Sequence, residues 1–351
     1  MTTQEFWQGK KVLVTGHTGF KGSWLCLWLN KLGADVSGIS LEPETVPNLF
    51  EDADIQGIVN SHFCDIRDRD ALEKLIKQIS PDIVFHLAAQ ALVRKSYSIP
   101  VETFDTNFTG TLNLLDALRK SVGVKVALMI TTDKVYSDNF GAHAYSENSA
   151  LGGHDPYSAS KAACEIVIDC YRKSYLSSTG PVIASVRAGN VIGGGDWSED
   201  RLIPDAIRAW DSGSQLEIRM PNAVRPWQHV LDPLYGYLKL AEAMWSDSKF
   251  ADSWNVGPQL ENVVTVREVI ERAHSFYGSG ETVYGESPPG LHEADCLRLN
   301  ASKIENELGI KAILPVHEAV GLTIEWYKKY RDGMNARGLC IADINSYQSM
   351  L

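Results

Sequence analysis

The chain has 351 residues, of which 44% are hydrophobic and 22% are charged, and its formal net charge is −11. At about 150 residues per domain, this length predicts two domains or one large α/β unit with an elaborated end. The ordinary composition excludes disorder, collagen and coiled coil, and the acidic total excludes a protein whose main role is to bind nucleic acid. A small anionic ligand is compatible with the composition and with the acidic net charge, because its site needs only a few local cations.

Targeting and redox signals are absent from the sequence. The amino-terminal segment lacks the basic region and long apolar run of a signal peptide. The most apolar window, residues 83–93, contains His86 and Gln90 and is too short to span a bilayer. The six cysteines form no Cys-x-x-Cys pair and no metal-ligand spacing. We therefore expect a cytoplasmic protein with reduced thiols, no metal and no membrane partner.

In the first 190 residues, short apolar runs alternate with helical patterns. The apolar runs predict strands at 11–16, 34–39, 57–63, 82–87, 124–130 and 181–186. Helical spacing predicts helices at 19–32, 68–79, 100–121 and 157–176. Strand–helix alternation of this kind predicts right-handed crossovers and a Rossmann-type, doubly wound parallel sheet in the α/β class.

The alternation ends after residue 190, where the Gly-rich segment 191–197 is followed by short mixed elements and scattered prolines. We therefore expect a Rossmann domain over residues 1–190 and a smaller C-terminal α/β domain, mainly for substrate, over residues 191–351. We also expect the chain to cross between the two. The tail from about Asp332 carries no functional signal.

Gly16, Gly19 and Gly22 lie in the turn between the first predicted strand and the first predicted helix. Glycines there let the backbone approach a pyrophosphate, which binds the free N–H groups of the helix N-terminus; the alternative is a tight turn without a ligand. An acid near the end of the second strand usually holds the adenosine ribose, but Ser40 offers only a neutral hydrogen bond. No nearby arginine would receive a 2′-phosphate, which favours NAD over NADP. His17 is bulky beside the phosphates and predicts modest cofactor affinity.

Tyr157 and Lys161 are four residues apart and lie on one face of a predicted helix. A cation there stabilises tyrosinate and lowers the pKa of the tyrosine, which makes a proton shuttle for an alcohol undergoing hydride transfer. Taken alone, the pair is better explained as a helix-surface pair, because this spacing occurs often by chance. It becomes a candidate site because Thr132 and Asp133 follow the strand at 124–130, where such sheets bind ligands.

Five motifs resemble the extended short-chain dehydrogenase/reductase family and, within it, the sugar-nucleotide 4,6-dehydratases. They span most of the chain in the right order: TGHTGFKG at 15–22, HLAAQ at 86–90, TTDKVY at 131–136, YSASK at 157–161 and RAGNVIGGGDW at 187–197. The triplet Thr132-Asp133-Lys134, together with Gln90 and the segment 225–230, is similar to the members that act on CDP-glucose.

The resemblance implies an NAD-dependent lyase that makes CDP-4-dehydro-6-deoxyglucose for deoxysugars of surface polysaccharides. C4 of the sugar is oxidised, with Tyr157 taking the hydroxyl proton beside Lys161 and Thr132 orienting the hydroxyl. The C5 hydrogen is then α to a carbonyl, Lys134 removes it as a base, and Asp133 protonates the departing C6 hydroxyl. The hydride returns to C6. Read by themselves, Asp133 fits a turn cap and Lys134 a solvated surface charge.

Further site residues follow from the resemblance. Asn107 is implied to support the catalytic helix, and Asp65 to meet the adenine ring; alternatively Asn107 caps its helix and Asp65 belongs to a turn. The implied cofactor site comprises Gly16, His17, Thr18, Gly19, Phe20, Gly22, Ser40, Asp65, Ile66, Leu87, Ala88, Ala89, Asn107, Tyr157 and Lys161.

The candidates for the sugar nucleotide are mostly arginines, because a guanidinium group binds phosphate oxygens in a fixed fork. They are Gln90, Arg187, Asn190, Arg201, Arg225 and Arg298. For any single arginine, a surface salt bridge is the alternative. Other readings of the whole chain are a 4,6-dehydratase acting on dTDP-glucose or GDP-mannose and a non-catalytic dinucleotide-binding sensor. The resemblance also implies a homodimer that pairs through the helices at 100–121 and 157–176.

Overall fold

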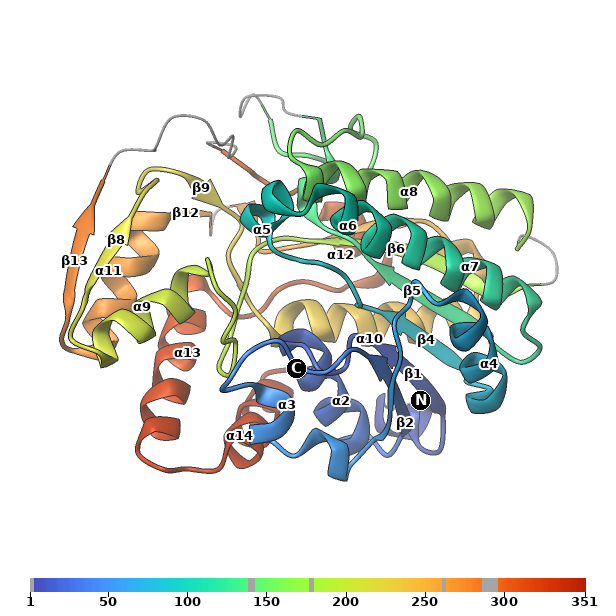
Figure 1. Cartoon of the computed structure of the whole chain (residues 1–351), viewed down its shortest axis with the longest axis horizontal. Helices are drawn as coiled ribbons and strands as arrows, with labels where there is room; N and C mark the ends of the chain where they lie inside the picture. The colour runs from blue at the N-terminus through green and yellow to red at the C-terminus, as the bar shows by residue number, and fades with distance from the viewer. Residues whose placement is uncertain (1–2, 138–142, 177–179, 261–262, 286–295) are drawn as a thin grey trace.

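The computed structural model describes residues 3–137, 143–176, 180–260, 263–285 and 296–351 (Figure 1). Its centre is a seven-stranded sheet in the order β11-β6-β5-β4-β1-β2-β3, and every pair of neighbours is parallel. The strands are β1 (Lys11–Thr15), β2 (Asp35–Ser40), β3 (Asn60–Phe63), β4 (Ile83–His86), β5 (Val126–Ile130), β6 (Val182–Ala188) and β11 (Ser253–Val256). The predicted doubly wound parallel sheet is confirmed.

The pleat of each strand sends alternate residues into two hydrophobic layers. On β1, Val12 and Val14 belong to the layer that holds helices α2 (Phe20–Lys31) and α10 (Leu231–Ser246), whereas Leu13 belongs to the opposite layer. That second layer is covered by α4 (Arg69–Ile79), α7 (Gly110–Lys120) and α8 (Pro156–Ser174). Burial on both sides explains why β1, β4, β5 and β6 are mainly apolar in sequence.

Side chains in the sequence fix where the helices on the second layer begin. Asp68 accepts the N–H of Ala71 at the start of α4, and Asp155 accepts the N–H of Ser158 at the start of α8. The single helix expected at 100–121 is divided into α6 (Pro100–Phe104), a π-helical turn η2 (Asp105–Thr109) and α7, with the short α5 (Val93–Ser98) before it. Such a π-turn inserts one extra residue into the helical period.

The chain after residue 190 builds small elements at the carboxyl end of the sheet and then returns to it. Between β7 (Val191–Ile192) and β13 it makes three two-stranded pairings: β7 with β10, β9 with β12, and β8 with β13. Strand β11 rejoins the main sheet beside β6. The elements are α9 (Leu202–Asp211), β8 (Gln215–Ile218), β9 (Val224–Arg225), β10 (Gln228–His229), β12 (Val264–Thr265), α11 (Val266–Tyr277), β13 (Glu281–Tyr284) and α12 (Ser302–Leu308).

The C-terminal tail folds back onto the first layer of helices. Helix α13 (Val316–Arg331) is followed by α14 (Ala336–Ser349), which contacts α2. The hydroxyl of the buried Tyr347 donates to Asp232 at 2.9 Å, and its ring packs edge-on against Trp28. The remaining short elements are α1 (Thr3–Trp7), α3 (Leu49–Asp52), η1 (Ile55–Gly57), η3 (Asp133–Val135) and η4 (Ser248–Phe250).

Membrane-spanning helices and metal-ligand clusters are absent from the described residues. Within those ranges no helix is both long and apolar enough to cross a bilayer. In the same part of the chain, no three His, Cys, Asp or Glu side chains are grouped so that they could hold a metal ion. All six cysteines are free thiols.

Candidate active site

A cavity of about 800 Å³ opens where the carboxyl ends of the central strands meet. Residues that follow β1, β2, β4, β5 and β6 line it from the sheet, and residues 188–205 and 216–227 contribute to its opposite wall. Strands β1 and β4 are neighbours at its centre although β2 and β3 separate them in sequence. This reversal of strand order is the place where open parallel sheets bind ligands.

The turn from β1 into α2 has no room for side chains at two of its glycines. Gly16 has a φ of +77°, and a Cβ there would lie 2.7 Å from the backbone nitrogen of Ala88. A Cβ on Gly22 would lie 2.1 Å from the carbonyl oxygen of Gly16. Gly19 is the N-cap of α2 and offers no side chain to the free N–H groups of the helix. The residues that carry these N–H groups line the cavity, and a helix N-terminus of this kind fits a pyrophosphate.

The residues expected around the adenosine half of a dinucleotide lie along one wall of the cavity. Ser40 Oγ is 2.7 Å from Thr18 Oγ1. The Ser40 hydroxyl, which was expected to bond the ribose, is therefore already hydrogen-bonded to a second hydroxyl. Asp65 pairs with Arg67 at 2.6 Å, and hydrogen bonds from Arg67 lower the pKa of Asp65. Arg67 therefore lies at the adenosine end of the cavity, a position that the sequence did not indicate. Its guanidinium group is already paired with Asp65. The wall also includes Gly16, Gly19, Phe20, Gly22, Ile66, Leu87, Ala88 and Ala89.

The side chain of His17 lies away from the cavity lining, which corrects the expectation that it crowds the phosphates. Its Nε2 is hydrogen-bonded to Ser61 Oγ at 2.5 Å, and its ring packs edge-on against Phe50. The ring occupies the space above Gly38, where a Cβ would lie 2.2 Å from it. Burial lowers the pKa of His17 to about 4, so the ring is neutral at physiological pH. Its bulk gives no reason for weak cofactor binding.

Three candidate catalytic residues lie directly beyond the end of β5. Thr132 is the N-cap of η3 and accepts the N–H of Lys134, and its hydroxyl also donates to Asp133 Oδ1 at 3.1 Å. Asp133 is 2% exposed, and its Oδ2 has no hydrogen-bond partner among the described residues. Burial raises the pKa of Asp133 against the opposing effect of the cations Lys134, Arg225 and Lys21. A raised pKa is the condition under which this carboxyl group can donate a proton.

Helix α8 brings Tyr157 and Lys161 to the same part of the cavity. Burial raises the pKa of Tyr157 to about 12, although a hydrogen bond with Thr132 favours the ionised form. Lys161 Nζ donates to the carbonyl oxygen of Ile130 at 3.2 Å, and burial lowers the pKa of this lysine. The expected lowering of the tyrosine pKa is therefore absent from this structure, because burial outweighs the hydrogen bond with Thr132 and the charge of Arg201. Further positive charge in the cavity is needed to reverse that balance.

Asn107 and Gln90 connect the turn after β4 to the catalytic helix. Asn107 Nδ2 donates to Ser160 Oγ at 2.9 Å and to the Gln90 carbonyl at 3.0 Å, while its Oδ1 accepts the N–H of Gln90 at 2.8 Å. The π-turn η2 is the local irregularity that carries Asn107. Gln90 lines the cavity, but its amide is bonded within the chain to Leu92 and Thr103. Asn107 itself is not part of the cavity lining.

The structure divides the predicted sugar-nucleotide residues into two groups. Asn190, Arg201 and Arg225 line the cavity, whereas Arg187 and Arg298 do not. Arg187 is 3% exposed and forms an ion pair with Glu165 at 2.8 Å, so its guanidinium is committed to the interior. Arg298 is exposed and lies between Cys296 and Leu299, which form isolated β-bridges. The ion pair corrects the prediction for Arg187, and a contact between Arg298 and the sugar nucleotide stays a prediction.

Several charged residues of the cavity wall escaped the sequence analysis. Lys21 lies within the glycine turn itself, donates to the hydroxyl of Tyr237 at 3.3 Å, and has a pKa lowered by burial to about 8. Because Lys21 lies between Gly19 and Gly22 of the glycine motif, the sequence could have identified it as a cavity residue. Arg94 and Arg219 both approach Asp200 Oδ1, at 3.4 and 3.3 Å. They are far apart in sequence, and no spacing pattern links them.

Comparison with known proteins places these features in a family. Residues 12–257 match the model of the NAD dependent epimerase/dehydratase family. The CDP-glucose 4,6-dehydratase of Salmonella typhimurium is 43% identical over 99% of both chains. A probable dTDP-glucose 4,6-dehydratase of Sinorhizobium fredii is 29% identical, covering 90% of this chain and 92% of that protein.

Solved structures agree with the fold. The dTDP-glucose 4,6-dehydratase from Bacillus anthracis, solved in complex with NAD, has a TM-score of 0.75 and 25% identity over 91% of this chain and 96% of that chain. The epimerase Mth375 of Methanothermobacter thermautotrophicus has a TM-score of 0.81 at 22% identity, covering 95% of this chain and 96% of that chain, and supports the fold alone.

Proposed function

The chain belongs to the NAD dependent epimerase/dehydratase family, and from that premise we propose that it uses NAD to convert CDP-glucose to CDP-4-dehydro-6-deoxyglucose. The observation that carries this proposal is the placement of Asp133 and Lys134 at the end of β5, in the same cavity as Tyr157. An acid and a base beside a proton shuttle suit an elimination that follows oxidation. The choice of nucleotide rests on the 43% identity to the CDP-glucose 4,6-dehydratase of Salmonella typhimurium.

The glycine turn and the adjacent wall fit NAD. The free N–H groups of α2 would hold its pyrophosphate, and the wall beyond Ser40 and Asp65 would hold its adenosine half. When bound, NAD supplies an acceptor for the C4 hydride and a donor for C6. The positive charge of its nicotinamide ring would add to that of Arg201 and favour the ionised form of Tyr157, whose pKa burial raises.

The chain's own residues move the protons. Tyr157, hydrogen-bonded to Thr132, takes the proton of the C4 hydroxyl during oxidation. Lys134, in its neutral form, takes the C5 proton once C4 is a carbonyl. Asp133, which burial favours in its protonated form, gives its proton to the departing C6 hydroxyl, which leaves as water. Lys134, whose ammonium protons exchange with solvent, returns a proton to C5 when the hydride returns to C6.

The opposite wall is assigned to the nucleotide end of the substrate. Arg201 and Arg225 are the predicted residues that line it, and Arg94 and Arg219 add two guanidinium groups held near Asp200. Guanidinium groups bind diphosphate oxygens in pairs. We accordingly assign cofactor and catalysis mainly to residues 1–190 and the sugar nucleotide mainly to residues 191–351, with β11 returning to the first part.

The function is tested by running the reaction in heavy water with added NAD and with CDP-, dTDP- or UDP-glucose or GDP-mannose in parallel. We expect a 4-keto-6-deoxy product from CDP-glucose with one solvent deuterium at C5, detected by NMR and mass spectrometry. A product without deuterium at C5 contradicts the elimination. Product from another sugar nucleotide reassigns the substrate, and product from none favours a binding protein.

We propose a homodimer that pairs through helices α7 and α8, which lie side by side on one side of the molecule (Figure 1). Exposed apolar side chains lie on α8 and on the contacting helix α6: Ile166 is 63% exposed, Val101 81% and Phe104 39%. Exposed apolar side chains on contacting helices support a protein interface.

Replacing Ile166 by glutamate is expected to convert the dimer to a monomer, because a charge would be buried at the centre of the interface. Sedimentation velocity measures the change. Val283→Glu is the matched control, since Val283 is also exposed but lies on β13. A wild-type protein that sediments as a monomer contradicts the proposal.

We also propose a cytoplasmic location. The six free thiols fit a reducing compartment, in which they persist without pairing. Fractionation of the producing cells tests this, and recovery in an oxidising compartment contradicts it.

A further inference from the structure

Helix α8 contacts the end of β5 through three residues spaced four apart. Tyr157 forms a hydrogen bond with Thr132, Lys161 donates to the Ile130 carbonyl, and Glu165 accepts from Thr131. Residues at this spacing share one face of a helix, so one face meets three consecutive residues of the chain. The proposed mechanism uses the first two contacts and leaves the third without a role.

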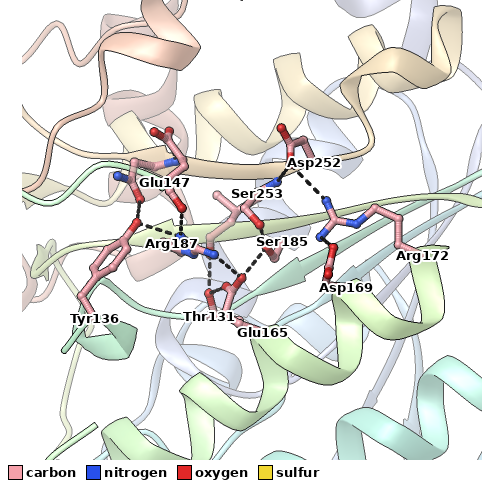
Figure 2. A network of polar contacts seen from close by, with 12 residues as sticks. Thr131, Tyr136, Glu147, Glu165, Asp169, Arg172, Ser185, Arg187, Asp252 and Ser253 are labelled. Carbon is pink, nitrogen blue, oxygen red and sulfur yellow. Dashed lines mark hydrogen bonds and ion pairs between the residues drawn. The ribbon is translucent and has the colours of Figure 1, made fainter. Parts of the chain in front are cut away.

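Glu165 is the centre of a buried polar network (Figure 2). Its Oε1 accepts from Thr131 Oγ1 at 2.5 Å, and its Oε2 accepts from Ser185 Oγ at 2.7 Å and from Arg187 Nη2 at 2.8 Å. Glu165 is 2% exposed and Arg187 3%. The carboxylate is therefore an ionised group with one counter-charge and bonds on both oxygens, which holds it in a single orientation.

Arg187 extends the network to the segment beyond the catalytic triplet. Its Nη1 donates to the hydroxyl of Tyr136 at 3.0 Å and to the carbonyl of Glu147 at 3.1 Å. The Tyr136 hydroxyl donates to Asn255 Oδ1 on β11 at 2.5 Å. The chain on both sides of Thr132, Asp133 and Lys134 is thus tied to one buried ion pair: Thr131 before the triplet and Tyr136 after it (Figure 2).

We propose that Glu165 is a positioning residue of the dehydration, acting through Thr131 to fix the strand end that carries Thr132, Asp133 and Lys134 against the helix that carries Tyr157 and Lys161. The residue touches neither substrate nor cofactor, since it is absent from the cavity lining. Catalytic groups that must act in sequence on neighbouring carbons need fixed separations, and a displacement of about 1 Å can cost about 100-fold in rate. This inference rests on the proposed dehydration.

The test removes the link without removing the ion pair. Replacing Glu165 itself would leave Arg187 buried without its counter-charge and destabilise the fold. Thr131→Val instead deletes only the hydroxyl that joins the strand end to Glu165, and Ser185→Ala deletes a matched hydroxyl bonded to the other carboxylate oxygen. Thr131→Ser keeps the hydroxyl and is the conservative variant.

We expect Thr131→Val to lower kcat for CDP-glucose about 10- to 100-fold with little change in KM, and Thr131→Ser to restore it. Ser185→Ala should keep kcat within about twofold while losing as much melting temperature as Thr131→Val, because each loses a buried hydroxyl that contacts Glu165 and one further polar group. Equal kcat values for Thr131→Val and Ser185→Ala overturn the proposal. A loss of kcat in Thr131→Val that is no larger than the loss of folded protein overturns it as well.

A second measurement separates this proposal from the proposed function. Hydrogen–deuterium exchange of the peptide covering residues 130–136 needs no substrate. Faster exchange there in Thr131→Val, but not in Ser185→Ala, supports positioning even if CDP-glucose is not the substrate. Unchanged exchange overturns it. Absence of turnover in the wild type with every sugar nucleotide overturns the proposed function instead.

Discussion

Replacing Asp133 by asparagine is expected to lower kcat for CDP-glucose by about 10²- to 10⁴-fold, the range that a positioned general acid contributes. The carboxyl group is buried, one of its oxygens has no partner among the described residues, and burial raises its pKa. Asparagine keeps the shape and the hydrogen bond with Thr132 but has no proton to give to the departing hydroxyl. NAD binding, measured by titration, should be unchanged.

The variant should stop the reaction after oxidation rather than before it. Acid quenching and mass spectrometry are then expected to find a 4-keto hexose that has lost two hydrogens but no water. Asp70→Asn is the matched control, because Asp70 is an exposed carboxylate on α4 outside the cavity lining. Full activity of Asp133→Asn would remove this residue from the mechanism and leave the acid unidentified.

The sheet was predictable from the sequence because each central strand is buried on both sides. Strand β5, for example, has no exposed residue, and its apolar run at 124–130 was recognised to within two residues. The glycine turn was predictable because Gly16 and Gly22 are places where no other residue fits. In both cases the physical constraint acts on residues that are close together in the chain.

Long-range contacts set the features that the sequence did not reveal. Arg187 follows a strand and precedes a glycine loop, which suggested a ligand contact, but its partner Glu165 is 22 residues away on another element. His17 occupies a space that Gly38 leaves open on the neighbouring strand. The helix expected at 100–121 is interrupted because its π-turn places Asn107 against Gln90 and Ser160, which helical periodicity does not show.

Replacing Tyr157 by phenylalanine is expected to lower kcat by about 10²- to 10⁴-fold as well, but at an earlier step than Asp133→Asn. The substitution removes only the hydroxyl that receives the C4 proton and keeps the ring that packs at the start of α8. Acid quenching should therefore find unchanged CDP-glucose and no 4-keto species. Melting temperature measured in parallel should change little, since the Thr132 hydroxyl retains Asp133 as a partner.

The two variants together decide whether one cavity carries out both oxidation and elimination. A Tyr157→Phe variant that accumulates the 4-keto hexose would show that another group takes the C4 proton. Because burial raises the pKa of Tyr157 to about 12, the tyrosinate is scarce at neutral pH until positive charge is added beside it. The rate of C4 oxidation, measured as 4-keto species formed in a single turnover, should therefore rise with pH up to the pKa that Tyr157 has with NAD bound, as the tyrosinate becomes more populated. If Tyr157 is the shuttle, the residual rate of the Tyr157→Phe variant should not rise with pH. A residual rate that still rises with pH would assign the titrating group to another residue.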